Sequence, residues 1–116
     1  MALTVYGYVQ LTGEGDGNLP ALRHALKTYA RAGDLFLASI YADLGTTGAS
    51  IDRNGLAALV NRLWLSRGRT GVLIPAPSHL SYNATLRRIV EQRITDTGAA
   101  IVAMYDNGAL PTGLRP

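Results

Sequence analysis

Two groups of polar residues could do chemistry in this sequence, and each group follows an apolar run. The first group, Gln10 and Thr12, ends the run Val5–Thr12, and the second group, Ser78–Tyr82, comes shortly after the run Gly71–Ile74. Amide, hydroxyl and imidazole groups of this kind form hydrogen bonds and could bind a small anion. If the protein has a site, we expect Gln10 and Thr12 at its centre.

The run Val5–Thr12 is the element expected to position this site. Most of it is apolar, β-branched or aromatic, and the glycine-rich loop Gly13–Gly17 follows at once. An apolar run bounded by turn residues is typical of a strand buried on both faces in the middle of a parallel sheet. Ligands of open α/β sheets bind just beyond the carboxyl ends of such strands, which is where Gln10 and Thr12 are expected.

The remainder of the chain alternates between helix and strand. This alternation predicts a single α/β domain over residues 1–106, in which three helices flank a small, mostly parallel sheet in three layers. Residues 107–116 contain Gly and Pro without periodicity and are predicted to form a flexible tail. The expected helices cover Leu22–Ala30, Leu56–Leu63 and Leu86–Ile94, and the later strands cover Leu35–Tyr41, Gly71–Ile74 and Ala99–Met104.

Several local features follow from residue type. Gly33 and Gly98 are expected to end the first and third helices, and Asp52 is expected to cap the start of the second. The segment Ala42–Ser50 is rich in Gly and Thr and is predicted to be a loop. Trp64 lies near the apolar stripe of the second helix, so we expect it to pack against the core rather than to bind a ligand.

Composition limits the classes of protein to which the chain could belong. Its 116 residues suffice for one domain, and 47% hydrophobic residues with a net charge of +3 favour a folded chain. The sequence has no cysteine, which excludes disulfides and cysteine-bound metals. Since no apolar segment is long enough to span a membrane and no signal peptide is recognisable, we expect a cytoplasmic protein without membrane contact.

No residue pattern points to a cofactor or a metal. The glycines of Gly13–Gly17 superficially resemble a dinucleotide-binding fingerprint, but they lack its full spacing. Glu14 and Asp16 would also repel a pyrophosphate. No set of His and Asp residues has the spacing of metal ligands, so we expect neither a cofactor nor a metal.

A row of basic residues lies on the first expected helix. Arg23, Lys27 and Arg31 recur at steps of four, which places them on one face of that helix. Such a row is typical of a solvated face, and a dedicated phosphate-binding role is the alternative. The net charge of +3 permits nucleic-acid binding but indicates it only weakly, because the charges do not form one block.

Five segments, in this order and spacing, resemble the catalytic domain of serine recombinases, the resolvase/invertase family. That family opens with a strand of the form Gly-Tyr-x-Arg-x-Ser, which corresponds to Gly7–Thr12 here. A helix bearing leucines and ending in a Tyr-Ala pair follows, then a strand ending in acidic and glycine-rich residues. An Arg-x-Gly-Leu step and an Asp-Arg-Leu-x-Arg tip complete the pattern. The matching segments are Leu22–Ala30, Tyr41–Gly48, Arg53–Leu56 and Ser78–Tyr82.

The resemblance implies a site for phosphoryl transfer. In the family, a serine hydroxyl attacks a DNA phosphodiester and becomes linked to the 5′ phosphate, while arginines neutralise charge on the phosphate. Of the corresponding positions only Arg53 keeps the family's residue, and Thr12 keeps a hydroxyl but adds a methyl group. Neutral or weakly basic side chains replace the other arginines, and a serine replaces the aspartate. The resemblance thus assigns the site to Gln10, Thr12, Arg53, Ser78, His79 and Tyr82.

Ordinary structural roles are open for three of these residues. His79, alone after a strand, is typical of a loop or cap histidine, and Tyr82 could cover the core. Arg53 could pair with Asp52 or Asp43 at the start of the second helix. These roles would need no ligand.

The sequence leaves three hypotheses for function. The leading one is a catalytically degenerate domain of serine-recombinase type, which acts as a regulatory or protein-interaction module in a DNA-related setting and is not an enzyme. The alternatives are an active DNA strand transferase, with Thr12 as nucleophile beside Arg53 and His79, and a small anion-binding module. The resemblance also implies a long dimer helix and a DNA-binding domain, where this sequence has its short tail. We therefore expect a protein partner or self-association, with only weak, non-specific DNA binding.

Overall fold

The computed structural model describes residues 3–11, 19–44, 54–66, 69–81 and 83–104. Within these ranges four strands alternate with three α-helices, as predicted, and one short 3-10 turn follows the third strand. Residues 107–116, the predicted tail, lie outside the described ranges. The elements are β1 (Leu3–Leu11), α1 (Leu19–Ala32), β2 (Leu35–Leu44), α2 (Asn54–Leu65), β3 (Thr70–Ile74), η1 (Pro77–His79), α3 (Ala84–Thr95) and β4 (Ala100–Ala103).

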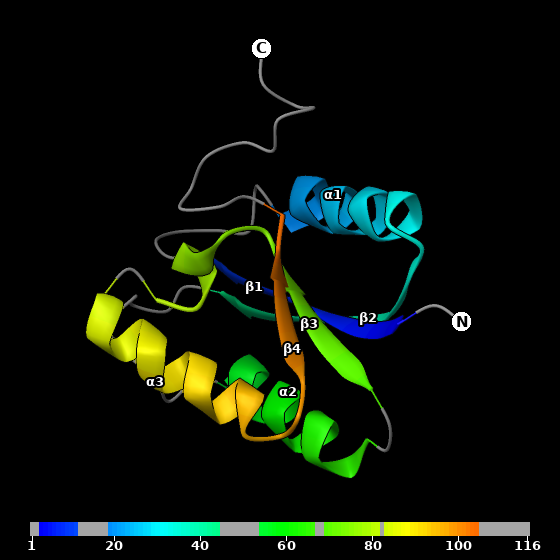
Figure 1. Cartoon of the computed structure of the whole chain (residues 1–116). Coiled ribbons are helices and arrows are strands. Elements are labelled where there is room, and N and C mark those ends of the chain that lie inside the picture. Colours follow the sequence, from blue (N-terminus) through cyan, green and yellow to red (C-terminus); the bar gives the residue numbers. More distant parts are fainter. Residues whose placement is uncertain (1–2, 12–18, 45–53, 67–68, 82, 105–116) are drawn as a thin grey trace.

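The four strands form one sheet in the order β2-β1-β3-β4, and every neighbouring pair is parallel. Helix α1 covers one face of this sheet, and α2 and α3 cover the other (Figure 1). The α/β class and the three-layer arrangement are therefore confirmed. Helices on both faces bury the central strands on both sides, which explains why β1 and β3 are apolar almost throughout.

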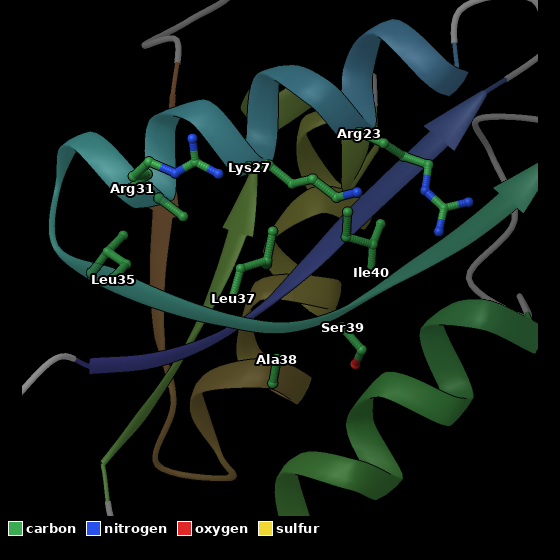
Figure 2. A pocket seen from close by; sticks show the side chains of 9 residues that line it. Arg23, Lys27, Arg31, Leu35, Leu37, Ala38, Ser39 and Ile40 are labelled. Carbon is green, nitrogen blue, oxygen red and sulfur yellow. The ribbon is translucent and has the colours of Figure 1, made fainter.

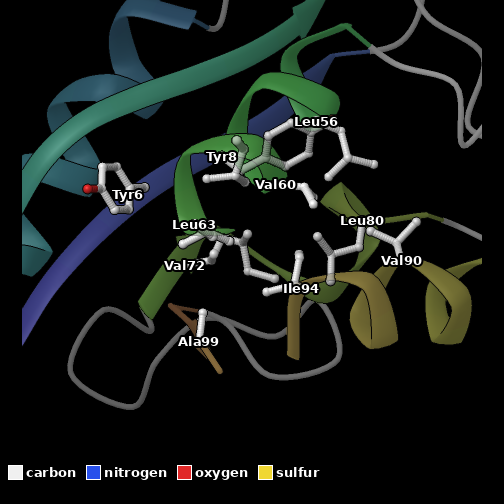
Figure 3. Close-up of a cluster of buried hydrophobic side chains, with 12 residues drawn as sticks. Tyr6, Tyr8, Leu56, Val60, Leu63, Val72, Leu80, Val90, Ile94 and Ala99 are labelled. Carbon is white, nitrogen blue, oxygen red and sulfur yellow. The ribbon is translucent and has the colours of Figure 1, made fainter. Parts of the chain in front are cut away.

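Strand β1 lies in the middle of the sheet and contributes to both cores. Val5 and Val9 point toward α1, where they pack with Leu26. Tyr6 and Tyr8 point to the opposite face and join the larger core beneath α2 and α3 (Figure 3). These four β1 side chains are at most 4% exposed, which confirms the strand buried on both faces.

Strand β2 forms an edge of the sheet and contains an irregularity. Its pairing with β1 runs from Val5 opposite Leu37 directly to Tyr6 opposite Ser39, so Ala38 has no partner on β1. The shift changes which side chains face α1, because alternate residues of a strand point to opposite faces. Two apolar pairs on either side of the shift consequently pack toward the same core: Leu35 with Leu37, and Ile40 with Ala42.

The end of β2 contradicts the predicted loop over Ala42–Ser50. The strand continues to Leu44, with Gln10 opposite Asp43 and Leu11 opposite Leu44. Aspartate is disfavoured in strands, which is why sequence reasoning ended this strand at Tyr41. Here the Asp43 carboxylate accepts hydrogen bonds from another element, so this cost is offset by tertiary contacts.

Helix α1 ends at Ala32, directly before Gly33 as predicted, and the Gly33 N–H donates to the Tyr29 carbonyl at 3.0 Å. The positive φ after this helix, 56°, belongs to Asp34. The prediction that Trp64 packs against the core was wrong. Trp64 is 60% exposed, because the buried face of α2 passes through Leu63 and a neighbouring position on a helix points elsewhere. The end of α3 was predicted correctly, since Gly98 follows it with a φ of 92°.

Candidate functional site

The carboxyl ends of β1, β2 and β3 meet at one edge of the sheet. Gln10 lies opposite Asp43 in the β1–β2 register, and the turn η1, which contains Ser78 and His79, lies beside Gln10. Three of the six predicted site positions are thereby brought to the expected edge or its adjoining turn. The other three, Thr12, Arg53 and Tyr82, lie outside the described residues.

The contact between Gln10 and His79 is the most specific feature of this edge. The backbone N–H of Gln10 donates to Nδ1 of the imidazole at 3.0 Å. Because Nδ1 accepts this hydrogen bond, it carries no proton, and the neutral ring holds its proton on Nε2. The histidine is thus an integral part of the strand edge rather than a freely solvated loop residue.

The environment of His79 also keeps it uncharged. The residue is half-buried, and this burial lowers the pKa of the imidazole from its ordinary value of 6.5. Burial acts in this direction because an imidazolium loses more hydration than a neutral ring. A proton on Nδ1 would also turn the acceptor for the Gln10 N–H into a second donor. His79 is therefore neutral at neutral pH.

Asp43 organises the same edge from the neighbouring strand. The residue is 6% exposed, and its Oδ1 accepts the N–H of Gly55 at 2.7 Å. Its Oδ2 accepts the N–H of Leu56 at 2.9 Å and the hydroxyl of Tyr8 at 2.7 Å. The carboxylate thus caps the first turn of α2 from outside the helix, a place where negative charge is favourable.

Gly55 makes this cap sterically possible. A Cβ at this position would lie 2.6 Å from the Ala42 carbonyl oxygen and 2.9 Å from Oδ2 of Asp43. Real Cβ atoms do not approach backbone oxygens so closely, so only glycine lets α2 start directly against the end of β2. The helix start at Asn54 is thereby held at the carboxyl edge, while the predicted cap Asp52 lies outside the described residues.

The turn that leads from η1 into α3 is also closely hydrogen-bonded. Ser81 is fully buried, its hydroxyl oxygen accepts the N–H of Asn83 at 3.1 Å, and its carbonyl accepts from Nη1 of Arg87 at 3.2 Å. Asn83 caps α3 through its side chain, which accepts the N–H of Leu86 at 3.0 Å. Arg87 thus places a guanidinium beside the turn that follows the candidate site.

The sequence indicated Asp43 as an acidic residue at the end of its strand and as one partner open to Arg53, but not as the cap of α2. Asp43 lies far before that helix in the sequence, and the expected cap was Asp52, directly ahead of it. Arg87 was not predicted as a contributor to this edge. Arg87 resembled any basic residue on a helix, since its contact with Ser81 depends on the tertiary structure. Both residues position backbone at the site.

The described part of the chain offers no constellation for a metal. Among the described residues, no group of three or more His, Cys, Asp or Glu side chains could hold an ion. No helix within the described ranges is both long and apolar enough to cross a membrane. As far as the structure describes it, the carboxyl edge instead carries neutral hydrogen-bonding groups around the buried Asp43 carboxylate, with the Arg87 guanidinium beside the turn that follows.

A parallel sheet in the order 2-1-3-4, with helices on both faces and polar residues at its carboxyl edge, defines a three-layer α/β domain. Crystal structures of serine recombinase catalytic domains share this fold. The C-terminal catalytic domain of ISC1926 TnpA, an IS607-like serine recombinase, aligns with a TM-score of 0.77 and 18% identity over 96% of this chain and 72% of its own. The chain therefore has a serine-recombinase-like fold.

Two further structures agree with this assignment. The N-terminal catalytic domain of TP901-1 integrase aligns with a TM-score of 0.74 and 20% identity, over 87% of this chain and 76% of its own. A resolvase family site-specific recombinase from Streptococcus pneumoniae aligns with a TM-score of 0.71 and 21% identity, over 87% of this chain and 71% of its own. The sequence matches no protein-family model and no curated protein, so these comparisons detect the similarity through the fold and not through the sequence.

Proposed function

We propose that this chain is a catalytically degenerate domain of serine-recombinase type, which acts as a regulatory or protein-interaction module in a DNA-related setting. The proposal includes the six positions at the carboxyl edge as the remnant of a phosphoryl-transfer site. Three solved structures named as recombinases or integrases, together with the quoted motifs, support the DNA-related setting.

The neutral pair formed by Gln10 and His79 carries this proposal. By the family resemblance, both residues occupy positions where a recombinase has arginine. In this structure the His79 ring accepts a hydrogen bond from the Gln10 backbone, and burial lowers its pKa, so neither position supplies positive charge at neutral pH. The loss of charge is thus supported by geometry as well as by residue type.

Charge at these positions matters because phosphoryl transfer relies on it. Negative charge on the phosphate oxygens is stabilised in the transition state by preorganised cationic donors, above all by the planar fork of arginine. Removing one well-aimed donor from such a site typically costs about a hundred- to a thousand-fold in rate. Neutral donors bind phosphate with about half the strength of charged ones, so glutamine and neutral histidine do not replace the missing guanidinium groups.

The proposal is tested by an attempt to restore a covalent protein–DNA adduct. Wild type, Thr12→Ser, and Thr12→Ser combined with Gln10→Arg, His79→Arg and Tyr82→Arg are each fused to the DNA-binding module of a serine recombinase. Each fusion is incubated with supercoiled DNA carrying the module's site, and adducts are resolved on a denaturing gel. Thermal denaturation of each fusion confirms that it is folded.

We expect no adduct with wild type or with Thr12→Ser alone. The serine hydroxyl is less hindered, but the charge that develops on the phosphate still meets neutral groups at positions 10 and 79. An adduct formed only by the arginine-restored protein would identify lost charge as the defect. An adduct formed by wild type or by the single variant would instead favour an active strand transferase that uses Thr12.

A further inference from the structure

A groove between α1 and the edge strand β2 lies away from the carboxyl-edge site. It is open to solvent and has a volume of about 460 Å³. Figure 2 shows Arg23, Lys27 and Arg31 along the side of α1 that faces β2, with strand residues below them. The strand contributes Leu35, Leu37, Ala38, Ser39 and Ile40, and no carboxylate is among the described residues that line the groove.

The three cations form a regular row along this groove. They recur every four residues on α1, so successive side chains are about 6 Å apart along the helix axis and the row spans about 12 Å. All three are exposed, and no ion pair joins them to a carboxylate in the described part of the chain. Because this spacing is comparable to the Debye length at physiological salt, about 8 Å, their fields act together on a ligand in the groove.

The carboxylates of the described residues do not cancel this charge. Asp43 is buried and occupied at the start of α2, and Glu91 and Asp96 belong to α3, on the opposite face of the sheet. Asp34 follows α1 beyond the Arg31 end of the row and does not line the groove, so it offsets charge at that end only. The groove is therefore a positively charged surface with an apolar floor.

The arrangement of the three cations in a row favours binding of a linear polyanion over binding of a single small anion. An isolated phosphate could reach one or two of the cations, whereas the row spans about 12 Å. Successive phosphates of one DNA strand rise about 3.4 Å along the helix axis and lie farther apart in space, because the strand winds around that axis, so three cations about 6 Å apart can each reach a different phosphate. Among the described residues that line the groove none is aromatic, so these residues offer a single strand no base stacking, and a duplex with outward phosphates fits better.

The open edge of β2 is a poor site for the alternative ligand, an acidic peptide added as an extra strand. Strand addition needs a regular row of backbone donors and acceptors, and the register shift at Ala38 interrupts that row in the middle of β2. Irregularities of this kind are a common way in which edge strands avoid pairing. A phosphate backbone needs only the side-chain cations of α1.

We propose that the groove between α1 and β2 binds the sugar-phosphate backbone of duplex DNA without reading its sequence. Arg23, Lys27 and Arg31 contact successive phosphates of one strand, and the apolar floor accommodates the sugars between them. The inference goes beyond the proposed function, because it assigns DNA contact to a surface outside the degenerate site. It holds whether or not the carboxyl edge retains chemistry, so the adduct assay and the assay below fail independently.

The test measures the salt dependence of binding to a fluorescent duplex of about 20 base pairs, by anisotropy between about 50 and 200 mM salt. Arg23→Gln/Arg31→Gln removes two charges from the groove. Arg69→Gln/Arg88→Gln is the matched control, because it removes two exposed arginines that lie outside the groove. Circular dichroism melting confirms that both proteins are folded, which is expected since glutamine is a good helix former.

Each phosphate contact contributes about 0.9 to the slope of log affinity against log salt, so the groove variant should reduce that slope by about two. The slope of the control variant should differ from the wild-type slope by less than about 0.5, which is about half of what one phosphate contact contributes. Lys27→Glu should weaken binding further than Lys27→Gln, because it places negative charge between the two arginines. A labelled single strand of equal length should bind more weakly than the duplex.

Three results would overturn the inference. Equal loss of slope in both double variants would show that binding follows net charge rather than the groove. An unchanged slope in the groove variant would exclude these contacts. Tighter binding of the single strand, or displacement of the duplex by poly-glutamate at a lower charge concentration than by unlabelled duplex, would reassign the groove to another ligand.

Discussion

The Nδ1 atom of His79 accepts the backbone N–H of Gln10 at 3.0 Å, which ties the turn after β3 to the carboxyl end of β1. These residues are far apart in the sequence, and each stands where the resemblance to serine recombinases places an arginine. A neutral hydrogen bond therefore stands at these two positions, and it holds η1 against the end of β1.

The first prediction follows from the protonation state of His79. Burial lowers the pKa of this imidazole in the folded protein below its unfolded value of about 6.5. Above about pH 6.5 the imidazole is neutral in both states, and its contribution to stability is fully present. As the pH falls below the unfolded pKa, the unfolded chain takes up a proton that the folded protein does not, so this contribution is lost. We therefore expect the free energy of unfolding, measured with urea, to decrease between about pH 7.5 and 5.5, by less than the one-proton limit of about 1.4 kcal/mol per pH unit.

Two variants test whether His79 causes this pH dependence of stability. His79→Gln cannot titrate, so its stability should be nearly constant over the same interval. His24→Gln removes an exposed histidine of α1 and should keep the wild-type decrease. A wild-type protein equally stable at both pH values would contradict the prediction, as would a decrease that disappears only in the His24 variant.

The second prediction concerns Asp43. Asp43→Ala leaves the N–H groups of Gly55 and Leu56 and the hydroxyl of Tyr8 without their shared acceptor. Loss of a helix cap and of hydrogen bonds to a buried carboxylate should lower the free energy of unfolding by about 2–4 kcal/mol. Tyr8→Phe removes only one of the three bonds and should cost about 1 kcal/mol. Urea denaturation of both variants checks this order, and a reversed order would show that the phenol rather than the cap matters.

The third prediction concerns the close approach of Gly55 to β2. Gly55→Ala places a Cβ within 3 Å of the Ala42 carbonyl oxygen and of the Asp43 carboxylate, so α2 must shift. We expect a loss of about 1–3 kcal/mol in thermal or urea denaturation, in the range of other overpacking changes. Gly33→Ala is the matched control, because its Cβ would meet nothing closer than 3.4 Å. Equal losses in the two variants would argue against a steric role for Gly55.

Much of this architecture could be predicted because its periodicity is strong. The apolar run of β1 and the helical spacing of Leu56, Leu59 and Val60 each favour one structure, and the alternation of elements defined the fold class. The errors have local causes. Asp43 continues a strand against its propensity because its carboxylate caps a helix, and Trp64 is one position beyond a buried residue of α2.

The site was less predictable than the fold. Residue types gave the edge on which Gln10 and His79 meet, since parallel strands end together. The bond between them depends on the register of β1 and on the conformation of η1, and neither is encoded in a local pattern. The groove beside α1 illustrates the same limit: the row from Arg23 to Arg31 was visible in the sequence, but its position over an irregular edge strand was not.

The fourth prediction concerns the exposed apolar side chains of α2. Trp64 and Leu65 are 60% and 76% exposed, respectively, and large apolar residues side by side on a surface are typical of a contact with another protein. Trp64→Gln/Leu65→Gln should change the free energy of unfolding by less than about 0.5 kcal/mol, as exposed positions usually do. The double variant should weaken self-association in sedimentation equilibrium, whereas Ala57→Gln/Asn61→Gln, also on exposed positions of α2, should not. Identical sedimentation of all three proteins would exclude this surface as a self-contact.

The fifth prediction is that an arginine at position 79 costs stability. Arginine carries only donors, so in His79→Arg the Gln10 N–H loses its acceptor. An unpaired buried N–H costs about 1–3 kcal/mol, and we expect the free energy of unfolding at pH 7.5 to fall by that amount. Ser78→Arg places the same side chain one residue earlier on η1 while His79 still accepts the bond, so its loss should be clearly smaller. Equal losses would attribute the effect to the bulk of arginine, whereas an unchanged His79→Arg protein would show that this edge tolerates arginine and that the bond from the Gln10 N–H adds little stability.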